Sequence, residues 1–372
     1  MHRHPPSVDP TTRAWPRTLQ VLEEGRAAGW HTGAQIALST PRGSVDLTHG
    51  EAQPGHPMRP DSVPLWLSAG KPITAVALAR LVDAGRLHWD DPVTTWIPEF
   101  GIEGKESITL RHLLTHTGGF RGADPGAIGR TWDESVAQAC AAPLESGWVV
   151  GETAGYHANG SWFVLGEILQ RVTGQPFADV IRSEVFDPLG LDEGWFGIDA
   201  ATQVALANRW VQVDRTGRDA CGPDPVLNDR EGITRCRPGS GLRAPARLLA
   251  GFYRRLLDPP RGWLSPGVLA ELTSPQRTGR FDQTFLAVID FGLGFILNSD
   301  RPGTRPVPYG YGPHAGPRTF GHSGNQSACA FADPDHDLTV AWVCNGLPGE
   351  LFHQRRQRAL NAAIYEDLGL AG

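Results

Sequence analysis

The chain has 372 residues, of which 40% are hydrophobic and 20% are charged, and its formal net charge is −6. This is the composition of a globular protein that buries roughly three quarters of the surface exposed by its unfolded chain. The slightly acidic balance argues against a nucleic-acid partner held through phosphate contacts, because such binding needs clustered positive charge.

Two absences and the cysteine pattern predict where the protein works. The N-terminal segment Met1-His2-Arg3-His4 lacks the apolar core of about 7–15 residues that a signal peptide requires. The sequence contains no stretch of about 18 apolar residues, the length that would span a membrane. The five cysteines lack the spacing of zinc or redox sites, which predicts reduced, buried side chains at Cys140, Cys221, Cys236, Cys329 and Cys344. We therefore expect a cytoplasmic protein without a cofactor.

The first part of the chain shows patterns of both strands and helices. The turn Pro41-Arg42-Gly43 is expected to join strands over 34–38 and 44–47. A strong helix is predicted over 67–87, with Gly85 where a C-terminal cap belongs. Further helices are predicted over 21–29, over 162–172 ending at Gly174, and over 177–186 ending at Pro188.

Strand patterns return near the C-terminus. Residues 291–297, 328–331 and 338–344 alternate or run apolar, and Asp333-Pro334-Asp335 is expected to turn between the last two. A final helix is predicted over about 350–368. Because strands occur at both ends and helical patterns fill the middle, two domains are expected. They are a discontinuous sheet domain, 1–85 plus 240–372, and a mostly helical domain, 86–239.

A short motif at the start of the long predicted helix can carry chemistry. The chain has only two lysines, Lys71 and Lys105, and the first follows Ser68 at i,i+3 spacing, which places both side chains on one helix face. A buried lysine is driven toward the neutral amine, which can accept the serine proton and so activate the nucleophile. Arginine cannot do this, because it stays protonated. The competing interpretation is a helix cap followed by a solvated lysine.

Further runs follow this Ser-x-x-Lys turn: Asp90-Asp91-Pro92-Val93, Ile97-Pro98-Glu99-Phe100, residues 108–120 (ITLRHLLTHTGGF), Phe186-Asp187-Pro188-Leu189-Gly190-Leu191, Phe291-Gly292-Leu293-Gly294 and Phe320-Gly321-His322-Ser323-Gly324. In this order they resemble the class C serine β-lactamases, their esterase relatives and the penicillin-binding proteins, from about residue 18 to the end. The resemblance implies an α+β fold with an antiparallel β-sheet flanked by helices and a mostly helical inserted domain. The active site is then expected in the cleft between the domains.

The family's second motif, Tyr-x-Asn, is altered in this chain. The corresponding residues are Tyr156-His157-Ala158-Asn159, so aligning Asn159 with the motif's asparagine places His157 where the family has tyrosine. A shift by one residue restores Tyr156, and the resemblance to esterase-like members with Tyr-His-Ala favours it as the partner of Lys71 in proton transfer. His157 remains an alternative base, and a hydrogen-bonded core tyrosine is the competing interpretation of Tyr156.

The third motif is Lys-Thr-Gly in β-lactamases and His-x-Gly in many esterase-like members, and His322-Ser323-Gly324 fits the second form. By resemblance, the backbone N–H groups of Ser68 and Asn325 form the oxyanion hole. The motif lacks the fixed cation that would hold a substrate carboxylate, which favours neutral esters or amides. A core histidine is the competing interpretation of His322. The residues expected to bind substrate are His157, Asn159, His322 and Gly324.

Two other patterns give weaker hypotheses. His112 and His116 are four residues apart, as helical metal ligands can be, but no acidic residue completes an HExxH pattern. The family run that contains both histidines implies structural roles, so no metal site is expected. The run from Gly321 to Asn325 resembles the GxSxG nucleophile elbow but fails at its fifth position.

Taken together, the motifs predict a serine hydrolase or acyltransferase. Ser68, deprotonated by Lys71 with Tyr156, is expected to attack the carbonyl of a small ester or amide and form an acyl-enzyme. Water, an alcohol or an amine then accepts the acyl group, so an esterase and a natural-product transacylase both fit. A non-catalytic ligand-binding or sensor protein on the same scaffold is the alternative from another class. No nucleic-acid or membrane partner is expected.

Overall fold

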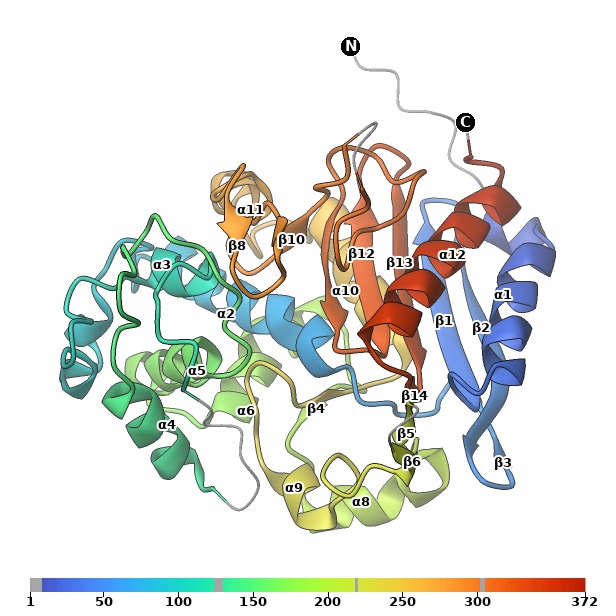
Figure 1. Ribbon diagram of the computed structural model, residues 1–372, viewed down its shortest axis with the longest axis horizontal. Helices are drawn as coiled ribbons and strands as arrows, with labels where there is room; N and C mark the ends of the chain where they lie inside the picture. The colour runs from blue at the N-terminus through green and yellow to red at the C-terminus, as the bar shows by residue number, and fades with distance from the viewer. Residues whose placement is uncertain (1–8, 124–129, 218–219, 302–304, 372) are drawn as a thin grey trace.

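A seven-stranded β-sheet with the order β10-β11-β12-β13-β1-β2-β3 organises the protein (Figure 1). The computed structural model describes residues 9–123, 130–217, 220–301 and 305–371, so the segment on which the signal-peptide expectation rests lies outside them. The strands are β1 (Gly33–Thr40), β2 (Gly43–Gln53), β3 (His56–Pro57), β10 (Ile296–Leu297), β11 (Phe320–Gly324), β12 (Ala328–Asp333) and β13 (Leu338–Cys344).

Every neighbouring pair in this sheet is antiparallel, and the two ends of the chain meet in its middle. Strand β1 pairs with β13, from Ala34 opposite Cys344 to Ser39 opposite Thr339. The predicted fold class, an antiparallel sheet flanked by helices, is therefore confirmed. The expected hairpin turn between β12 and β13 is also present, with Asp333 paired to Leu338.

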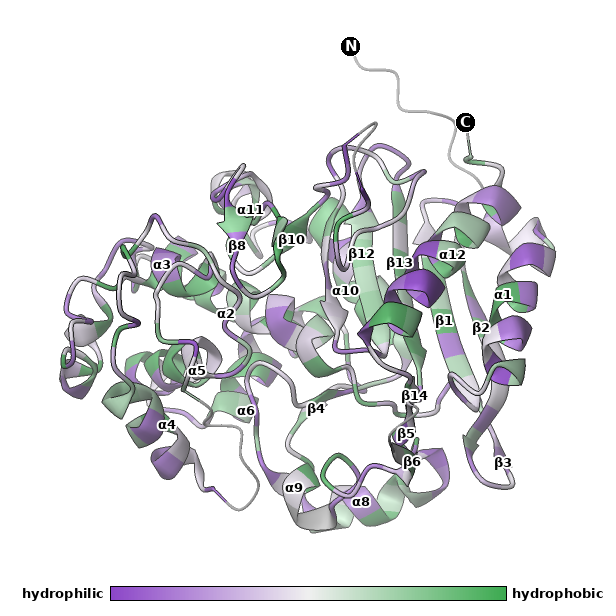
Figure 2. Ribbon diagram, viewed as in Figure 1, coloured by the Kyte–Doolittle hydropathy of each residue, from purple (hydrophilic) through white to green (hydrophobic). Residues whose placement is uncertain are grey.

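Helices cover both faces of the sheet (Figure 1). Helix α10 (Ala246–Leu257) packs on one face, and α1 (Pro16–Ala27) and α12 (Glu350–Leu368) lie together on the other. Successive side chains of a strand point to opposite faces, so Ala341 and Val343 join one hydrophobic core and Val340 and Trp342 join the other. This explains why β13 runs apolar without alternation, and Figure 2 shows β12 and β13 as mostly hydrophobic.

A group of helices lies beside the sheet: α2 (Lys71–Asp83), α3 (Leu110–Leu114), α4 (Trp132–Ala141), α5 (Gly160–Thr173) and α6 (Phe177–Ile181) (Figure 1). Helix α2 is at the centre, because α5, α6, α11 (Pro266–Thr273) and β11 all pack against it. Its residues from Lys71 to Ala79 are all buried. This packing fixes the position of the turn that precedes α2.

The middle of the chain also contains short strands, so the expectation of a mostly helical region omitted several elements. The remaining α-helices among the described residues are α7 (Asp187–Leu189), α8 (Ala200–Ala205) and α9 (Arg230–Thr234). Small sheets pair β4 (Trp195–Phe196) with β7 (Leu242–Arg243), β5 (Asp214–Gly217) with β6 (Ala220–Pro223) and β14 (Gly346–Leu347), and β8 (Phe281–Asp282) with β9 (Ala287–Val288).

Three predicted elements were wrong in part. The helix expected over 67–87 is a 3₁₀ turn, Leu67–Gly70, followed by α2, which ends at Asp83. The expected cap glycine is confirmed, because Gly85 follows the C-cap Ala84 in the left-handed conformation, with a φ of +67°. The strand expected over 291–297 is reduced to β10, because Gly292 donates to the Phe295 carbonyl in a tight turn. Pro188 does not end its helix, since it occupies the first turn of α7, where proline is tolerated.

The cysteines agree only partly with the expectation of buried thiols. All five are free, but Cys221 is exposed and Cys236 is half-buried. Within the described ranges, no helix is both long enough and apolar enough to cross a membrane.

Candidate active site

The 3₁₀ turn before α2 brings Ser68 and Lys71 together. Side chains at i and i+3 eclipse in a 3₁₀ turn, and the Lys71 Nζ atom lies 2.9 Å from the Ser68 Oγ atom. The turn is held from both sides, because Trp66 donates through its backbone to Leu242 and through its indole to Ala244. The serine and lysine that the sequence predicted as partners are therefore in contact.

The surroundings of Lys71 favour an uncharged amine. Its side chain is fully buried, and its Nζ donates to the carbonyl oxygens of Ala158 (2.9 Å) and Gly239 (2.8 Å). Burial lowers the pKa of Lys71 well below its ordinary value, since no carboxylate among the described residues offsets the cost of desolvation. A neutral amine has two N–H donors for the two carbonyls, which leaves its lone pair for Ser68.

Tyr156 faces the same space. Its ring centroid lies 5.3 Å from the Lys71 Nζ, and the residue lines the cavity that contains Ser68. The phenol oxygen has no hydrogen bond of good geometry among the described residues. Burial raises the pKa of Tyr156, and the nearby Ser68 hydroxyl offsets part of this rise. The phenol is therefore protonated at neutral pH and available to donate a proton.

A buried ion pair holds the backbone of Tyr156 in place. The Asp282 Oδ1 accepts from the backbone N–H groups of Tyr156 (3.1 Å), Thr284 (2.9 Å) and Phe285 (3.0 Å). The Asp282 Oδ2 pairs with the Arg277 guanidinium at 3.0 Å, and both side chains are excluded from solvent. The Thr284 hydroxyl adds a bond to the Tyr156 carbonyl at 3.1 Å.

The structure does not bring His157 to the cavity, contrary to its expected role in substrate binding and as an alternative base. Its Nε2 accepts from the backbone N–H groups of Gly119 (3.0 Å) and Phe120 (3.2 Å), and its side chain is 1% exposed. Burial lowers the pKa of His157 to about 4. Residues 156 and 157 direct their side chains to different sides of the segment. The Tyr156 side chain therefore lines the cavity, whereas the His157 imidazole holds the backbone at Gly119 and Phe120.

The third motif lies on β11, next to the Ser68 turn. His322 lines the cavity, and its Nδ1 lies 2.8 Å from the Ser323 carbonyl. Burial lowers the pKa of His322 to about 3, so the imidazole is neutral. Gly324 allows the strand to approach the turn, because a Cβ atom there would lie 2.4 Å from the Trp66 carbonyl oxygen.

The backbone groups expected to form an oxyanion hole come from these two neighbouring segments. Neither the Ser68 N–H nor the Asn325 N–H donates to another group in the part of the chain that the structure describes. Among the residues of β11, strand β10 pairs with Phe320 and Gly321, so its pairing does not extend to His322, Ser323 and Gly324. Both donors are therefore available to a ligand that enters beside Ser68.

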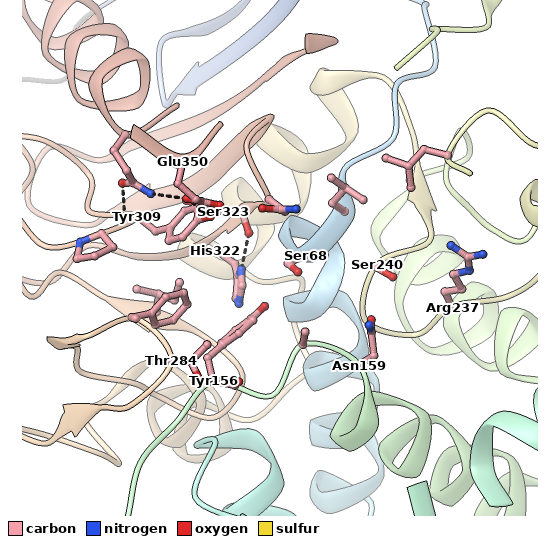
Figure 3. Close-up of a pocket in the computed structure, with 18 residues that line it drawn as sticks. Ser68, Tyr156, Asn159, Arg237, Ser240, Thr284, Tyr309, His322, Ser323 and Glu350 are labelled. Carbon is pink, nitrogen blue, oxygen red and sulfur yellow. Dashed lines mark hydrogen bonds between the residues drawn. The ribbon is translucent and has the colours of Figure 1, made fainter. Parts of the chain in front are cut away.

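The cavity has a volume of about 640 Å³. Figure 3 shows Tyr156 and His322 on one side of Ser68, and Asn159, Ser240 and Arg237 on the other. The expected residue Asn159 is thus at the cavity. Sequence reasoning missed several lining residues, whose positions depend on contacts distant in the chain: Arg237, Ser240, Thr284, Phe285, Tyr309, Glu350 and Gln354.

The two histidines that resembled metal ligands make other contacts. His112 accepts the Thr109 backbone N–H at 3.2 Å and so closes a capping box at the start of α3. His116 is buried, and its ring packs against Tyr156 with a centroid separation of 4.5 Å. Within the described residues, no group of three or more His, Cys, Asp or Glu side chains is arranged to hold a metal ion.

The antiparallel sheet, the buried α2 helix and the Ser68–Lys71 contact together define the β-lactamase and penicillin-binding-protein class. A profile of the Beta-lactamase family matches residues 19–364, and the chain therefore belongs to that family. The protein is an enzyme of the serine hydrolase type, since its relatives include proteins named esterase and carboxylesterase.

Three relatives illustrate the similarity. The esterase/beta-lactamase LipL of Mycobacterium tuberculosis is 27% identical, over 92% of this chain and 82% of LipL. The esterase EstB of Burkholderia gladioli is 34% identical, but the match spans only 48% of this chain and 49% of EstB. The crystal structure of a family VIII carboxylesterase superposes with a TM-score of 0.78 at 25% identity, covering 95% of this chain and 97% of that one.

Proposed function

We propose that the protein cleaves small esters or amides by two-step covalent catalysis, with Ser68 as the nucleophile. The observation that carries the proposal is the 2.9 Å separation of Ser68 Oγ and Lys71 Nζ, at an amine whose other partners are two carbonyl oxygens. The lone pair of a neutral amine in this position faces the serine hydroxyl. Lys71 is therefore suited to accept the Ser68 proton.

In the acylation step, the Ser68 oxygen bonds to the substrate carbonyl carbon while its proton passes to Lys71. The N–H groups of Ser68 and Asn325 stabilise the resulting oxyanion. When the intermediate collapses, the bond to the leaving alcohol or amine breaks, and the leaving group takes the Tyr156 proton. Lys71 then returns its proton to Tyr156, and the acyl group remains on Ser68.

Deacylation reverses these roles. Water loses a proton toward Lys71 and Tyr156 as it attacks the acyl carbon, and Ser68 recovers its hydrogen. An alcohol or amine that replaces water gives acyl transfer, so hydrolysis and transfer share one acyl-enzyme. The neutral state of His322, whose pKa is lowered to about 3, supports neutral acyl groups over carboxylates at the third motif.

The cavity also supports the proposed division of the chain into a sheet domain, 1–85 plus 240–372, and a helical domain, 86–239. Its lining includes Ser68 and His322 from the first part and Tyr156, Asn159 and Arg237 from the second. We therefore place the active-site cleft between the two proposed domains.

Turnover of p-nitrophenyl acetate and butyrate by matched variants tests the proposed mechanism. Ser68→Ala and Lys71→Arg should each lower kcat by up to about a million-fold. When catalytic residues act as a unit, the loss of one lowers the rate about as much as the loss of all of them. Lys105→Arg is the control, since Lys105 is also buried but donates to the carbonyls of Cys140 and Ala142, away from Ser68. Near-normal turnover by Lys71→Arg contradicts the mechanism.

The fate of the acyl group separates the remaining possibilities. With hydroxylamine or a primary alcohol added, a ligated product in excess of the free acid identifies a transacylase, whereas free acid alone identifies a hydrolase. Ligand binding by the wild-type protein without turnover of any ester or amide favours the sensor alternative.

A further inference from the structure

One wall of the cavity carries a carboxylate at the start of α12. Glu350 is the first residue of that helix, and Tyr309 and Gln354 lie beside it on the cavity lining. Figure 3 shows Glu350 and Tyr309 on the His322 side of Ser68, whereas Arg237 lies on the opposite side. The wall was not anticipated from the sequence, because none of its residues belongs to the three motifs.

The Glu350 carboxylate is held firmly but is not neutralised. The Tyr309 hydroxyl lies 2.7 Å from its Oε1 and 2.8 Å from its Oε2, and the Gln354 amide donates to Oε2 at 3.4 Å. None of the ion pairs between described residues includes Glu350.

Aromatic rings adjoin this carboxylate. The Tyr309 ring packs against Phe285 with a centroid separation of 5.5 Å, and Phe285 packs against Tyr156 at 4.7 Å. Phe285 and Tyr309 both line the cavity. Aromatic faces attract cations through the ring quadrupole, and quaternary and primary ammonium groups are recognised in this way. A carboxylate next to two such rings matches an ammonium group and repels a second carboxylate.

We propose that the wall formed by Glu350, Tyr309 and Phe285 is a subsite for an ammonium group, and that the preferred substrates are esters or amides carrying such a group. This inference rests on the proposed function, because it assigns the charge of the substrate that acylates Ser68. The competing interpretation is that Glu350 only fixes Tyr309 and begins α12. Under that interpretation the enzyme does not distinguish a cationic substrate from a neutral one of the same shape.

Isosteric substrate pairs separate the two interpretations. In each pair a trimethylammonium group is replaced by a tert-butyl group of the same shape. Acetylthiocholine is compared with 3,3-dimethylbutyl thioacetate for the leaving-group side. The p-nitrophenyl esters of 4-(trimethylammonio)butanoate and 5,5-dimethylhexanoate are compared for the acyl side. The readout is the ratio of kcat/KM for the cationic member to that for the neutral member.

For at least one pair, the wild-type ratio should exceed about ten, and Glu350→Gln should bring it close to one. Glu366→Gln is the matched control, because it removes the same charge from the other end of α12, where Glu366 pairs with Arg17. That variant should retain the wild-type ratio. Added salt should lower the wild-type ratio and leave that of Glu350→Gln unchanged, since salt screens exposed charges.

The outcomes also distinguish this inference from the function on which it rests. Turnover of the neutral esters with a ratio near one in the wild type overturns the ammonium subsite and leaves Ser68 catalysis intact. An unchanged ratio in Glu350→Gln has the same meaning. If the wild type turns over p-nitrophenyl acetate but no ester of either pair, the subsite is overturned alone. If it turns over none of these esters, the proposed function fails, and the subsite fails with it.

Discussion

Replacement of Asp282 by asparagine is expected to weaken both the stability and the activity of the enzyme. The carboxylate is fully buried, accepts the Tyr156 N–H and neutralises Arg277. Asparagine keeps the size of the side chain but removes its charge. Arg277 would then remain as a buried cation that still donates to the carbonyls of Thr115 and Ile289.

The expected magnitude follows from this arrangement. Removing one partner of a buried ion pair costs about 3–5 kcal/mol, because the other charge is left uncompensated. The backbone N–H of Tyr156 also exchanges a charged acceptor for a weaker amide oxygen. Since a displacement of about 1 Å in a catalytic group can cost on the order of a hundredfold in rate, we expect kcat to fall by roughly ten- to a hundredfold.

Urea unfolding and ester turnover of two matched variants provide the assay. Asp290→Asn is the control, because Asp290 is also nearly buried and pairs with Arg301 at 2.7 Å, but it binds the Gly279 N–H instead of the Tyr156 segment. Arg301 is 55% exposed, so this pair should contribute about 1 kcal/mol or less. If Asp282→Asn is as stable as Asp290→Asn and retains wild-type kcat, the reasoning about the buried pair is refuted.

Three further predictions concern pH and packing. Because burial lowers the pKa of Lys71, the unfolded chain holds a proton that the folded chain lacks between the folded-state pKa and about pH 10.4. Urea unfolding should therefore show Lys71→Met gaining stability relative to the wild type as the pH falls from 10 to 8, and a constant difference contradicts this. A hydrogen bond to Asp333 raises the pKa of His336, so protonated His336 stabilises the folded state below about pH 6.5 and this stabilisation is lost as the pH rises through the folded-state pKa. In thermal unfolding, the melting temperature of His336→Gln should lack this decrease with pH. Gly324→Ala should lower turnover at least tenfold, because the added Cβ pushes β11 away from the Ser68 turn. Gly267→Ala is the control, since it lies in open space on α11 and should only raise the melting temperature slightly. Equal turnover in both variants would refute the close approach of β11 as a requirement for activity.

Local spacing was enough to predict that Ser68 and Lys71 lie in contact, whereas their roles as nucleophile and base were expected from the resemblance and remain proposals. Ser68 and Lys71 are one turn apart, so any helical conformation brings their side chains together. The scarcity of lysine was less informative, because Lys105 is equally buried and only binds carbonyl oxygens near the end of α4. The distinction between the two lysines came from the neighbouring serine.

The ambiguity between Tyr156 and His157 required the three-dimensional structure. Adjacent residues direct their side chains differently, and the sequence does not show which one faces Ser68. The Gly119 and Phe120 N–H groups that His157 accepts from are 38 and 37 residues away in the chain, and Asp282 is 126 residues from Tyr156. Contacts of this range leave no local pattern.

Contacts between distant parts of the chain also explain why the additional cavity residues were missed and why one predicted strand was wrong. Glu350 begins a helix whose bounds were predicted, but its place on the cavity depends on how α12 packs against the sheet. The apolar run 291–297 is typical of a strand, yet Gly294 has a φ of +80° and packs against α2, where a Cβ would lie 2.5 Å from the Ala75 side chain. Tertiary packing overrides the local preference there.

The most direct test of the account is the mass of the intact protein after exposure to a fluorophosphonate and to p-nitrophenyl esters, followed by peptide mapping. If Ser68 is the nucleophile, the wild type should carry one adduct per chain, located on the peptide that contains Ser68, and Ser68→Ala should carry none. An adduct that persists on Ser68→Ala, or that maps to another residue of the wild type, would contradict the assignment of Ser68 as the nucleophile.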